Sequence, residues 1–508
     1  MSDTGTPTCT AEPGAHGTPS TGRAVCRNFG FLAVGRVSAN LCAFVFFALL
    51  SRAFGQEGIG QYSFATACAG FFAVGADFGL YEFTMRELSR RNGAFGQYYA
   101  EIFCVRLLLC LATLGVFFLL LPLVPMLWEV RWVAFIVMLQ QTSYTLVDGV
   151  LGLCIARGDT HIASLWEVVF RLLAALVGAM VIIAGGSLIL ALGTQPLITL
   201  AQLVTLVRVG GKRYGSLWPT LPTLNTIRQT LHTAVPFALS GALMQLSSRI
   251  DILVLAVLLG AAATGVYSAA YRVVFTMLFV PPLIGVSIFP LAAKLYATDP
   301  TAVPAFYSKV VNEVLLLALP AAAGLWLIAP KLVPLLFGPD FGDSVPPLRI
   351  LAWLFLATCY RSVLETFLLS CDLQMTRTKT QWLAAWISVA ATILLILGIG
   401  VPGAAVATLA AEVTVVLLYV YHLKARIGWP MLDARVAIGV VATGTFFVPL
   451  YLHPPESLLL LIVLAVALYV GTLLLFREIR GTEGAFALET FSRIIGRPLA
   501  KDEAVSET

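Results

Sequence analysis

Charged side chains recur inside the long apolar runs of this chain, where a charge is costly. Arg36, Arg249 and Arg272 each lie in such a run, with no acidic residue three or four positions away to neutralise them. An unpaired charge at bilayer depth costs about 3 kcal/mol, so it normally faces a bundle interior or a wet cavity. A guanidinium fork matches two phosphate oxygens. We therefore expect these arginines to line a lumen that accepts an anion such as pyrophosphate; structural bonds between helices are the alternative.

Further charges in the apolar runs have a second interpretation. Arg361 and Glu365 are four residues apart, as are Glu167 and Arg171, so the members of each pair share one helical face and can neutralise each other. We expect Glu167 and Arg171 to be a structural pair, whereas Arg361 joins the candidate pyrophosphate-binding residues. Candidates for a proton- or cation-sensitive group are the carboxylates Asp77, Asp251 and Glu365.

The elements that must position these residues are membrane helices. Hydrophobic residues make up 59% of the 508 residues and charged residues 12%. The net charge of +5 follows membrane topology, so no nucleic-acid partner is implied. The nine cysteines contain no Cys-x2-Cys pair and predict neither a metal site nor a disulfide framework. No phosphate-binding loop for ATP occurs and no cofactor is expected.

One string, Gly-x4-Gly-x-Tyr-Ser-x-Ala, occurs twice. The first copy contains Gly55, Gly60 and Tyr62, and the second contains Gly260, Gly265 and Tyr267, at a constant offset of 205 residues (55 to 260, 60 to 265). Each copy links two apolar runs, so we interpret it as a repeat or hinge motif. Duplicated membrane lobes are typical of secondary transporters.

The apolar runs predict an all-α polytopic membrane protein with about fourteen transmembrane helices. The expected spans are 27–50, 62–82, 98–125, 132–155, 163–184, 187–208, 231–259, 264–289, 310–336, 346–370, 380–400, 402–424, 434–452 and 456–476. They divide the chain into a disordered cytoplasmic tail (1–22), an N-lobe (23–208), an inter-lobe linker (209–230), a C-lobe (231–424), two extra helices (425–476) and a cytoplasmic tail (477–508).

Basic residues between the spans predict the orientation. Most of them fall on the side that carries both termini, and the opposite side holds Arg52, Arg131, Lys331 and Arg349. Because Lys and Arg are in excess on the cytoplasmic side, both termini are expected in the cytoplasm.

Four stretches carry a resemblance to a known family. They are Arg36 through "LLSRAFGQEGIGQYSFATACAGFFAVGADFGL", "SSRIDILVLAVLLGAAATGVYSAAYRVV" (247–274), "LLFGPDFGDSVPPLRILAW" (335–353) and "GIGVPGAAVATLAAE" (398–412). Together they resemble the polysaccharide transporter (Wzx-like, O-antigen flippase) family of the multidrug/oligosaccharidyl-lipid/polysaccharide (MOP) flippase superfamily. The resemblance covers roughly residues 25–425.

The resemblance implies two pseudo-symmetric six-helix lobes around a central cavity that works by alternating access. It implies a non-enzymatic flippase that moves undecaprenyl-pyrophosphate-linked oligosaccharide to the outer leaflet, for O-antigen, capsule or exopolysaccharide synthesis. The expected location is the cytoplasmic membrane of a bacterium or archaeon, with membrane lipids and polysaccharide assembly proteins as partners and a monomer as the default. Many family members have twelve spans, so the last two here either form a side groove for the lipid tail or pack outside.

Three alternatives stay open. A multidrug or cation antiporter of the same superfamily would favour an acidic, aromatic cavity, and a lipid II flippase would share most of the features above. A membrane glycan polymerase or glycosyltransferase would normally carry a large outer loop or an acidic catalytic motif, and neither is visible in the sequence.

Overall fold

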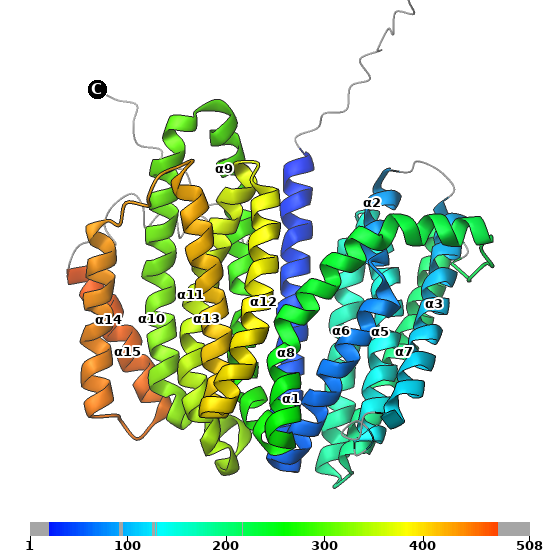
Figure 1. Cartoon of the computed structure of the whole chain (residues 1–508), viewed down its shortest axis with the longest axis horizontal. Coiled ribbons are helices and arrows are strands. Elements are labelled where there is room, and N and C mark those ends of the chain that lie inside the picture. The colour runs from blue at the N-terminus through cyan, green and yellow to red at the C-terminus, as the bar shows by residue number, and fades with distance from the viewer. Residues whose placement is uncertain (1–19, 91–94, 124–127, 129, 216, 476–508) are drawn as a thin grey trace, which may run out of the picture.

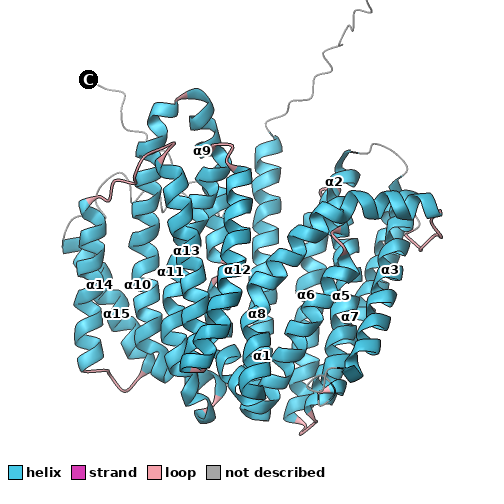
Figure 2. Ribbon diagram, viewed as in Figure 1, coloured by secondary structure: helices cyan, strands magenta, loops and turns pink. Residues whose placement is uncertain are grey.

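The computed structural model describes residues 20–90, 95–123, 128, 130–215 and 217–475. Within these ranges every regular element is helical, and the helices are joined by short loops (Figure 2). The two expected tails lie outside the described residues, except that Ser20 begins the first helix. The predicted all-α polytopic membrane fold is therefore confirmed, and the cytoplasmic placement of the termini stays a prediction.

The N-terminal half contributes seven helical elements. They are α1 (Ser20–Asp77), α2 (Leu80–Arg90), α3 (Phe95–Leu120), η1 (Leu121–Leu123), α5 (Arg131–Ala156), α6 (Thr160–Ile183) and α7 (Leu188–Tyr214). The second half repeats this plan with α8 (Leu224–Met277), α9 (Val280–Thr298), η2 (Pro300–Ala302), α10 (Val303–Phe337), η3 (Pro339–Ser344), α11 (Val345–Ser370), α12 (Gln374–Ile399) and α13 (Val401–Lys424). Two further helices follow, α14 (Ala434–Leu452) and α15 (Leu458–Leu475).

Nine segments of the described chain are long and apolar enough to cross a membrane. Two of them, Val37–Glu87 and Ser248–Thr298, are 51 residues long, which is about 75 Å of helix and more than twice the thickness of a bilayer core. Each overlaps two of the predicted spans, and α14 and α15 are shorter apolar helices. Large apolar side chains on the outer faces, such as Ile183, Leu397 and Leu459, are exposed, as lipid-facing residues must be.

The two long segments reverse direction at the repeated motif. Gly55 (φ 63°) and Gly260 (φ 85°) have left-handed backbone conformations inside α1 and α8, which glycine adopts without the steric cost that a Cβ would bring. Each glycine thus forms an elbow between two antiparallel spans. The repeat predicted from the sequence is a real structural duplication.

The two elbows pack against each other. A Cβ on Gly60 would lie 1.7 Å from the carbonyl oxygen of Ala261, and a Cβ on Gly265 would lie 1.9 Å from that of Gln56. Positions 56 and 60 differ from 261 and 265 by the same 205 residues, so the contact is self-complementary, like the isologous interface of a two-fold dimer. We call these four residues the elbow contact; α1 and α8 meet there at the lower edge of Figure 1.

The C-terminal end of α10 completes the closed end of the molecule. Arg52 donates from Nε to the carbonyl oxygen of Leu336 (3.0 Å) and from Nη2 to that of Leu335, where the last carbonyls of a helix lack partners and carry partial negative charge. The amide of Gln56 donates to the carbonyl oxygen of Asp340. From this end the two groups of helices diverge toward the other edge (Figure 1).

The two extra helices pack on the outside of the second lobe. Phe446, Leu450 and Tyr469 form a buried cluster with Ala323 and Leu327 of α10. The Tyr469 hydroxyl donates to the carbonyl oxygen of Leu316, also on α10. The helices α14 and α15 are thus fixed to α10 and lie at the periphery of the bundle (Figure 1).

Candidate functional site

The helix α5 carries the polar face that the site is built on. Gln140, Gln141, Tyr144, Thr145 and Asp148 form the series i, i+1, i+4, i+5 and i+8, which places them along one side of the helix. The helix α5 is not among the nine apolar segments of the described chain, because this face is polar. Every one of these five side chains borders a cavity.

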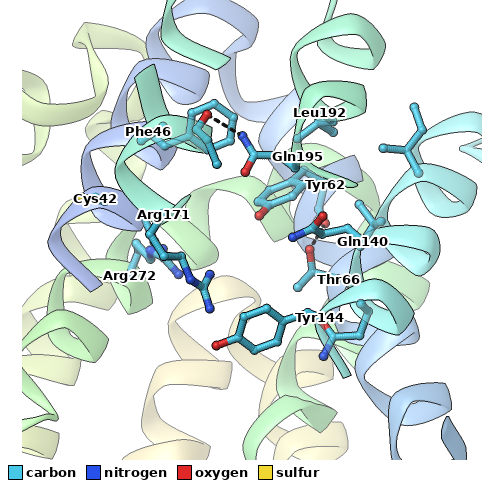
Figure 3. Close-up of a pocket in the computed structure, with 16 residues that line it drawn as sticks. Cys42, Phe46, Tyr62, Thr66, Gln140, Tyr144, Arg171, Leu192, Gln195 and Arg272 are labelled. Carbon is cyan, nitrogen blue, oxygen red and sulfur yellow. Dashed lines mark hydrogen bonds between the residues drawn. The ribbon is translucent and has the colours of Figure 1, made fainter. Parts of the chain in front are cut away.

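The first cavity, cavity 1, has a volume of about 240 Å³ and lies between α1, α5, α6, α7 and α8 (Figure 3). The helix α8 contributes a single residue, Arg272. Polar and aromatic side chains dominate the rest of the lining: Cys42, Phe46, Tyr62, Thr66, Gln140, Gln141, Tyr144, Arg171 and Gln195.

Two arginines form the cationic side of cavity 1. The guanidinium of Arg171 lies over the ring of Tyr144, 4.3 Å from its centroid, and that of Arg272 lies over Phe47 at 5.4 Å. The Nε atom of each is buried without a hydrogen-bond partner. Within the described residues neither arginine has a carboxylate within 4.0 Å. Guanidinium groups without a direct ion pair in a partly desolvated cavity can accept an anion.

The opposite side of cavity 1 is uncharged. The amide of Gln140 donates to Thr199 Oγ1 (3.0 Å), and that of Gln195 donates to the carbonyl oxygen of Ala174 (3.0 Å). The Tyr62 ring lies beside the Gln195 and Gln140 amides, and the Tyr144 ring lies beside Arg171 (Figure 3). Cavity 1 therefore has a cationic side and a neutral, hydrogen-bonding side.

A second cavity of about 340 Å³, cavity 2, adjoins the first, because Thr66 and Gln141 line both. Its charged lining residues are Asp77, Glu82, Asp148 and Arg249. Carboxylates outnumber the single guanidinium of Arg249 there, so cavity 2 favours a cation or a neutral group over a phosphate.

A buried arginine supports the wall of cavity 2. Arg106, whose exposed fraction is 1%, reaches Asp77 at 3.0 Å and donates to the carbonyl oxygen of Thr145 at 3.0 Å. Asp77 is thus an ion-paired carboxylate at the cavity edge. Its predicted role as a coupling group stays a prediction.

The structure separates the candidate arginines. Arg272 lies in cavity 1 and Arg249 in cavity 2. The backbone of Arg36 belongs to α1, but its side chain lies outside the described residues. Arg361 borders neither cavity; it pairs with Glu365 (2.8 Å) and with Glu412 (2.5 Å).

The two remaining carboxylate candidates are engaged away from the cavities. Glu365 pairs with Arg377 as well as with Arg361. Asp251 is 6% exposed and accepts hydrogen bonds from the backbone N–H of Ile252 (2.8 Å) and from the hydroxyl of Tyr267. Neither lines cavity 1 or cavity 2.

Sequence reasoning missed Arg171 and the polar face of α5 as site residues. Arg171 was expected to pair with Glu167, but Glu167 Oε1 accepts from the Tyr144 hydroxyl (3.2 Å) and Arg171 stacks on the same ring. The low hydropathy of α5, with adjacent glutamines at 140 and 141, was the signal that could have revealed this face.

Comparisons with known proteins place the chain in a family. Residues 25–296, more than half of the chain, match the family model described as "Polysaccharide biosynthesis protein". The lipopolysaccharide biosynthesis protein WzxC of Escherichia coli (strain K12) is 34% identical over 107 residues. That stretch spans 21% of this chain and 22% of WzxC.

Solved structures share the fold at low identity. The inward closed conformation of the lipid II flippase MurJ is 13% identical and superposes with a TM-score of 0.72, covering 89% of this chain and 99% of that one. A multidrug resistance MATE family transporter of the MOP superfamily superposes with a TM-score of 0.62 in its inward-facing conformation (15% identical). In its outward-facing conformation the TM-score is 0.52 (16% identical). Each match covers 80% of this chain, and 99% and 95% of those chains. The chain shares the multi-pass membrane fold of these structures, and it belongs to the polysaccharide biosynthesis protein family.

Proposed function

We propose that this protein is a flippase that moves a lipid-linked oligosaccharide across the membrane, with the pyrophosphate held by Arg171 and Arg272. The observation that carries the proposal is the cationic side of cavity 1, where neither guanidinium forms an ion pair within 4.0 Å with a carboxylate of the described chain. A pyrophosphate supplies the missing negative charge and paired oxygens. Membership of a polysaccharide biosynthesis family and the flippase fold support a lipid-linked glycan as the anion.

Alternating access is the mechanism that the architecture supports. The elbow contact and the Arg52 hydrogen bonds close one end, and the helices diverge at the other. With both termini in the cytoplasm, as the basic residues predict, cavity 1 faces the cytoplasm in this state. The higher similarity to the inward-facing MATE conformation agrees with this assignment. Translocation then requires the elbow contact to open and the diverging end to close.

The surroundings of such a flippase follow from the same assignment. The protein acts in the bacterial cytoplasmic membrane, without chemistry on the substrate, and serves O-antigen, capsule or exopolysaccharide synthesis. One chain contains both lobes, so a monomer suffices. Membrane lipids and polysaccharide assembly proteins are its expected neighbours.

The test is transbilayer movement of undecaprenyl-pyrophosphate-linked oligosaccharide in proteoliposomes, read by accessibility of the glycan to an added glycosidase. Arg272→Ala removes a charge-assisted hydrogen bond and should slow movement about tenfold or more. Arg349→Ala is the matched control, because Arg349 also lies over an aromatic ring, Trp326 at 4.2 Å, but borders neither cavity. Equal rates for the wild type and Arg272→Ala would remove the pyrophosphate assignment.

A cation antiporter is the second candidate, because carboxylates dominate cavity 2. The same vesicles, loaded with an organic cation and given a proton gradient, distinguish the two. Cation export without glycan movement would replace the flippase with an antiporter that uses Asp77, Glu82 and Asp148.

A further inference from the structure

The repeated motif gives its two tyrosines equivalent positions but different surroundings. Tyr267, in the second copy, is fully buried. Its hydroxyl donates to Asp251 Oδ2 and lies 3.0 Å from Thr408 Oγ1. Every hydrogen-bonding capacity of this phenol is used inside the C-lobe, so Tyr267 has a structural role.

Tyr62, in the first copy, has no such anchor. At the offset of 205 residues the counterpart of Asp251 is Phe46, which cannot accept a hydrogen bond. Within the described chain the Tyr62 hydroxyl has no hydrogen bond. The backbone carbonyl oxygen of Tyr62 accepts one from Thr66 Oγ1 (2.7 Å). Instead, the side chain lines cavity 1 (Figure 3). The N-lobe therefore presents to the cavity a phenol that the C-lobe uses for packing.

Apart from Arg272, which lines the same cavity, the groups around Tyr62 are neutral donors and acceptors. Gln195 uses its amide nitrogen on Ala174, which leaves its carbonyl oxygen available. Gln141 lies at the junction of the two cavities and forms no side-chain hydrogen bond within the described residues. A phenol beside the free carbonyl oxygen of Gln195 and the unpaired amide of Gln141 offers both donors and acceptors on an apolar ring face. Sugar hydroxyl and acetamido groups need such partners, whereas an anion is better held by the arginines opposite.

We propose that Tyr62, with Gln141 and Gln195, forms a subsite for the uncharged sugar next to the pyrophosphate. This proposal rests on the flippase assignment and adds a glycan contact to it. The substrate lies across cavity 1, with the pyrophosphate on Arg171 and Arg272 and the first sugar against the Tyr62 side. Tyr62 is a specificity-determining residue in this arrangement.

The native thiol of Cys42 provides the readout, because Cys42 also lines cavity 1. Full-length protein in detergent is treated with a maleimide, and modification at Cys42 is quantified by peptide mass spectrometry against ligand concentration. One probe is undecaprenyl pyrophosphate; the other is the same lipid carrying a single N-acetylglucosamine. Tyr62→Phe is compared with two controls, Tyr267→Phe at the equivalent repeat position and Tyr99→Phe, whose buried hydroxyl has no partner.

In the wild type the sugar-bearing lipid should protect Cys42 at about fivefold lower concentration than the sugar-free lipid, as expected for one net hydrogen bond. Tyr62→Phe should abolish this difference and leave protection by undecaprenyl pyrophosphate unchanged, while both controls keep the difference. Equal protection by the two lipids in the wild type, or a full difference in Tyr62→Phe, would overturn the subsite but not the flippase. No protection by either lipid would overturn both.

Discussion

Adding one methyl group at the elbow contact should shift the protein away from its inward-facing state. In Gly265→Ala the new Cβ would lie 1.9 Å from the Gln56 carbonyl oxygen, and in Gly60→Ala it would lie 1.7 Å from that of Ala261. A carbon and a carbonyl oxygen normally approach no closer than about 3.3 Å. The elbows must therefore separate by more than 1 Å, because backbone atoms on both sides cannot move independently.

The size of the shift follows from the cost of overpacking, which is about 1–3 kcal/mol for an extra methyl in a well-packed site. In the proposed alternating-access cycle only the inward-facing state contains this contact, so the whole cost falls on that state. The equilibrium between the two states should move by a factor of about 5–150 toward the outward-facing form. The same opening should break the Arg52 and Gln56 hydrogen bonds to the α10 end and η3.

Cys42 in cavity 1 again reports the state. A membrane-impermeant maleimide is added to intact cells, where it reaches only the outer side, and to inverted vesicles, where it reaches only the cytoplasmic side. Gly265→Ala should raise outer labelling and lower cytoplasmic labelling. Gly193→Ala and Gly324→Ala are the controls, because a Cβ at either position meets no atom within 4 Å. A labelling pattern for Gly265→Ala identical to these controls would refute the gating role of the elbow contact.

Three further predictions concern the buried charges. Arg171→Ala should slow glycan movement about tenfold while protein abundance stays normal; normal movement with low abundance would return Arg171 to a structural role. Glu412→Gln takes a carboxylate from Arg361 and should lower the free energy of unfolding by about 1–3 kcal/mol, measured as a lower midpoint in thermal denaturation; an unchanged midpoint would contradict it. Arg106→Met leaves Asp77 without its ion pair and should lower the free energy of unfolding by about 3–5 kcal/mol, measured as lower abundance in the membrane. Adding Asp77→Asn should restore part of that abundance; no recovery in the double variant would exclude the ion pair as the cause.

Local sequence patterns predicted the helices and the duplication well. Apolar run length identified the spans, and the repeated glycines marked the two elbows, because both signals depend on neighbours in sequence. The repeat could not show that Gly60 approaches Ala261 and Gly265 approaches Gln56, since packing between lobes depends on tertiary structure.

Helical spacing predicted ion pairs within one helix but not contacts between charged residues of different helices. The spacing of Arg361 and Glu365 predicted their ion pair, but Glu412 comes from α13 and was invisible to helical spacing. The same spacing rule suggested a direct ion pair between Glu167 and Arg171. In the structure Arg171 lies over the ring of Tyr144, whose hydroxyl donates to Glu167. Identical motif positions likewise concealed that Tyr62 and Tyr267 have different partners, because Phe46 and Asp251 differ.

The polar face of α5 has a consequence for synthesis of the protein. As the ribosome delivers this helix to the membrane, its glutamines, Tyr144 and Asp148 weaken its own partition into lipid. Helices already in the membrane must therefore cover the polar face of α5. The helix α7, which packs against α5 in the finished bundle, is made later and cannot yet do so. If α5 stayed outside the bilayer, every later span would enter with reversed orientation. The polar side chains that line the proposed glycan site are thus the same ones that disfavour insertion of α5 into the membrane.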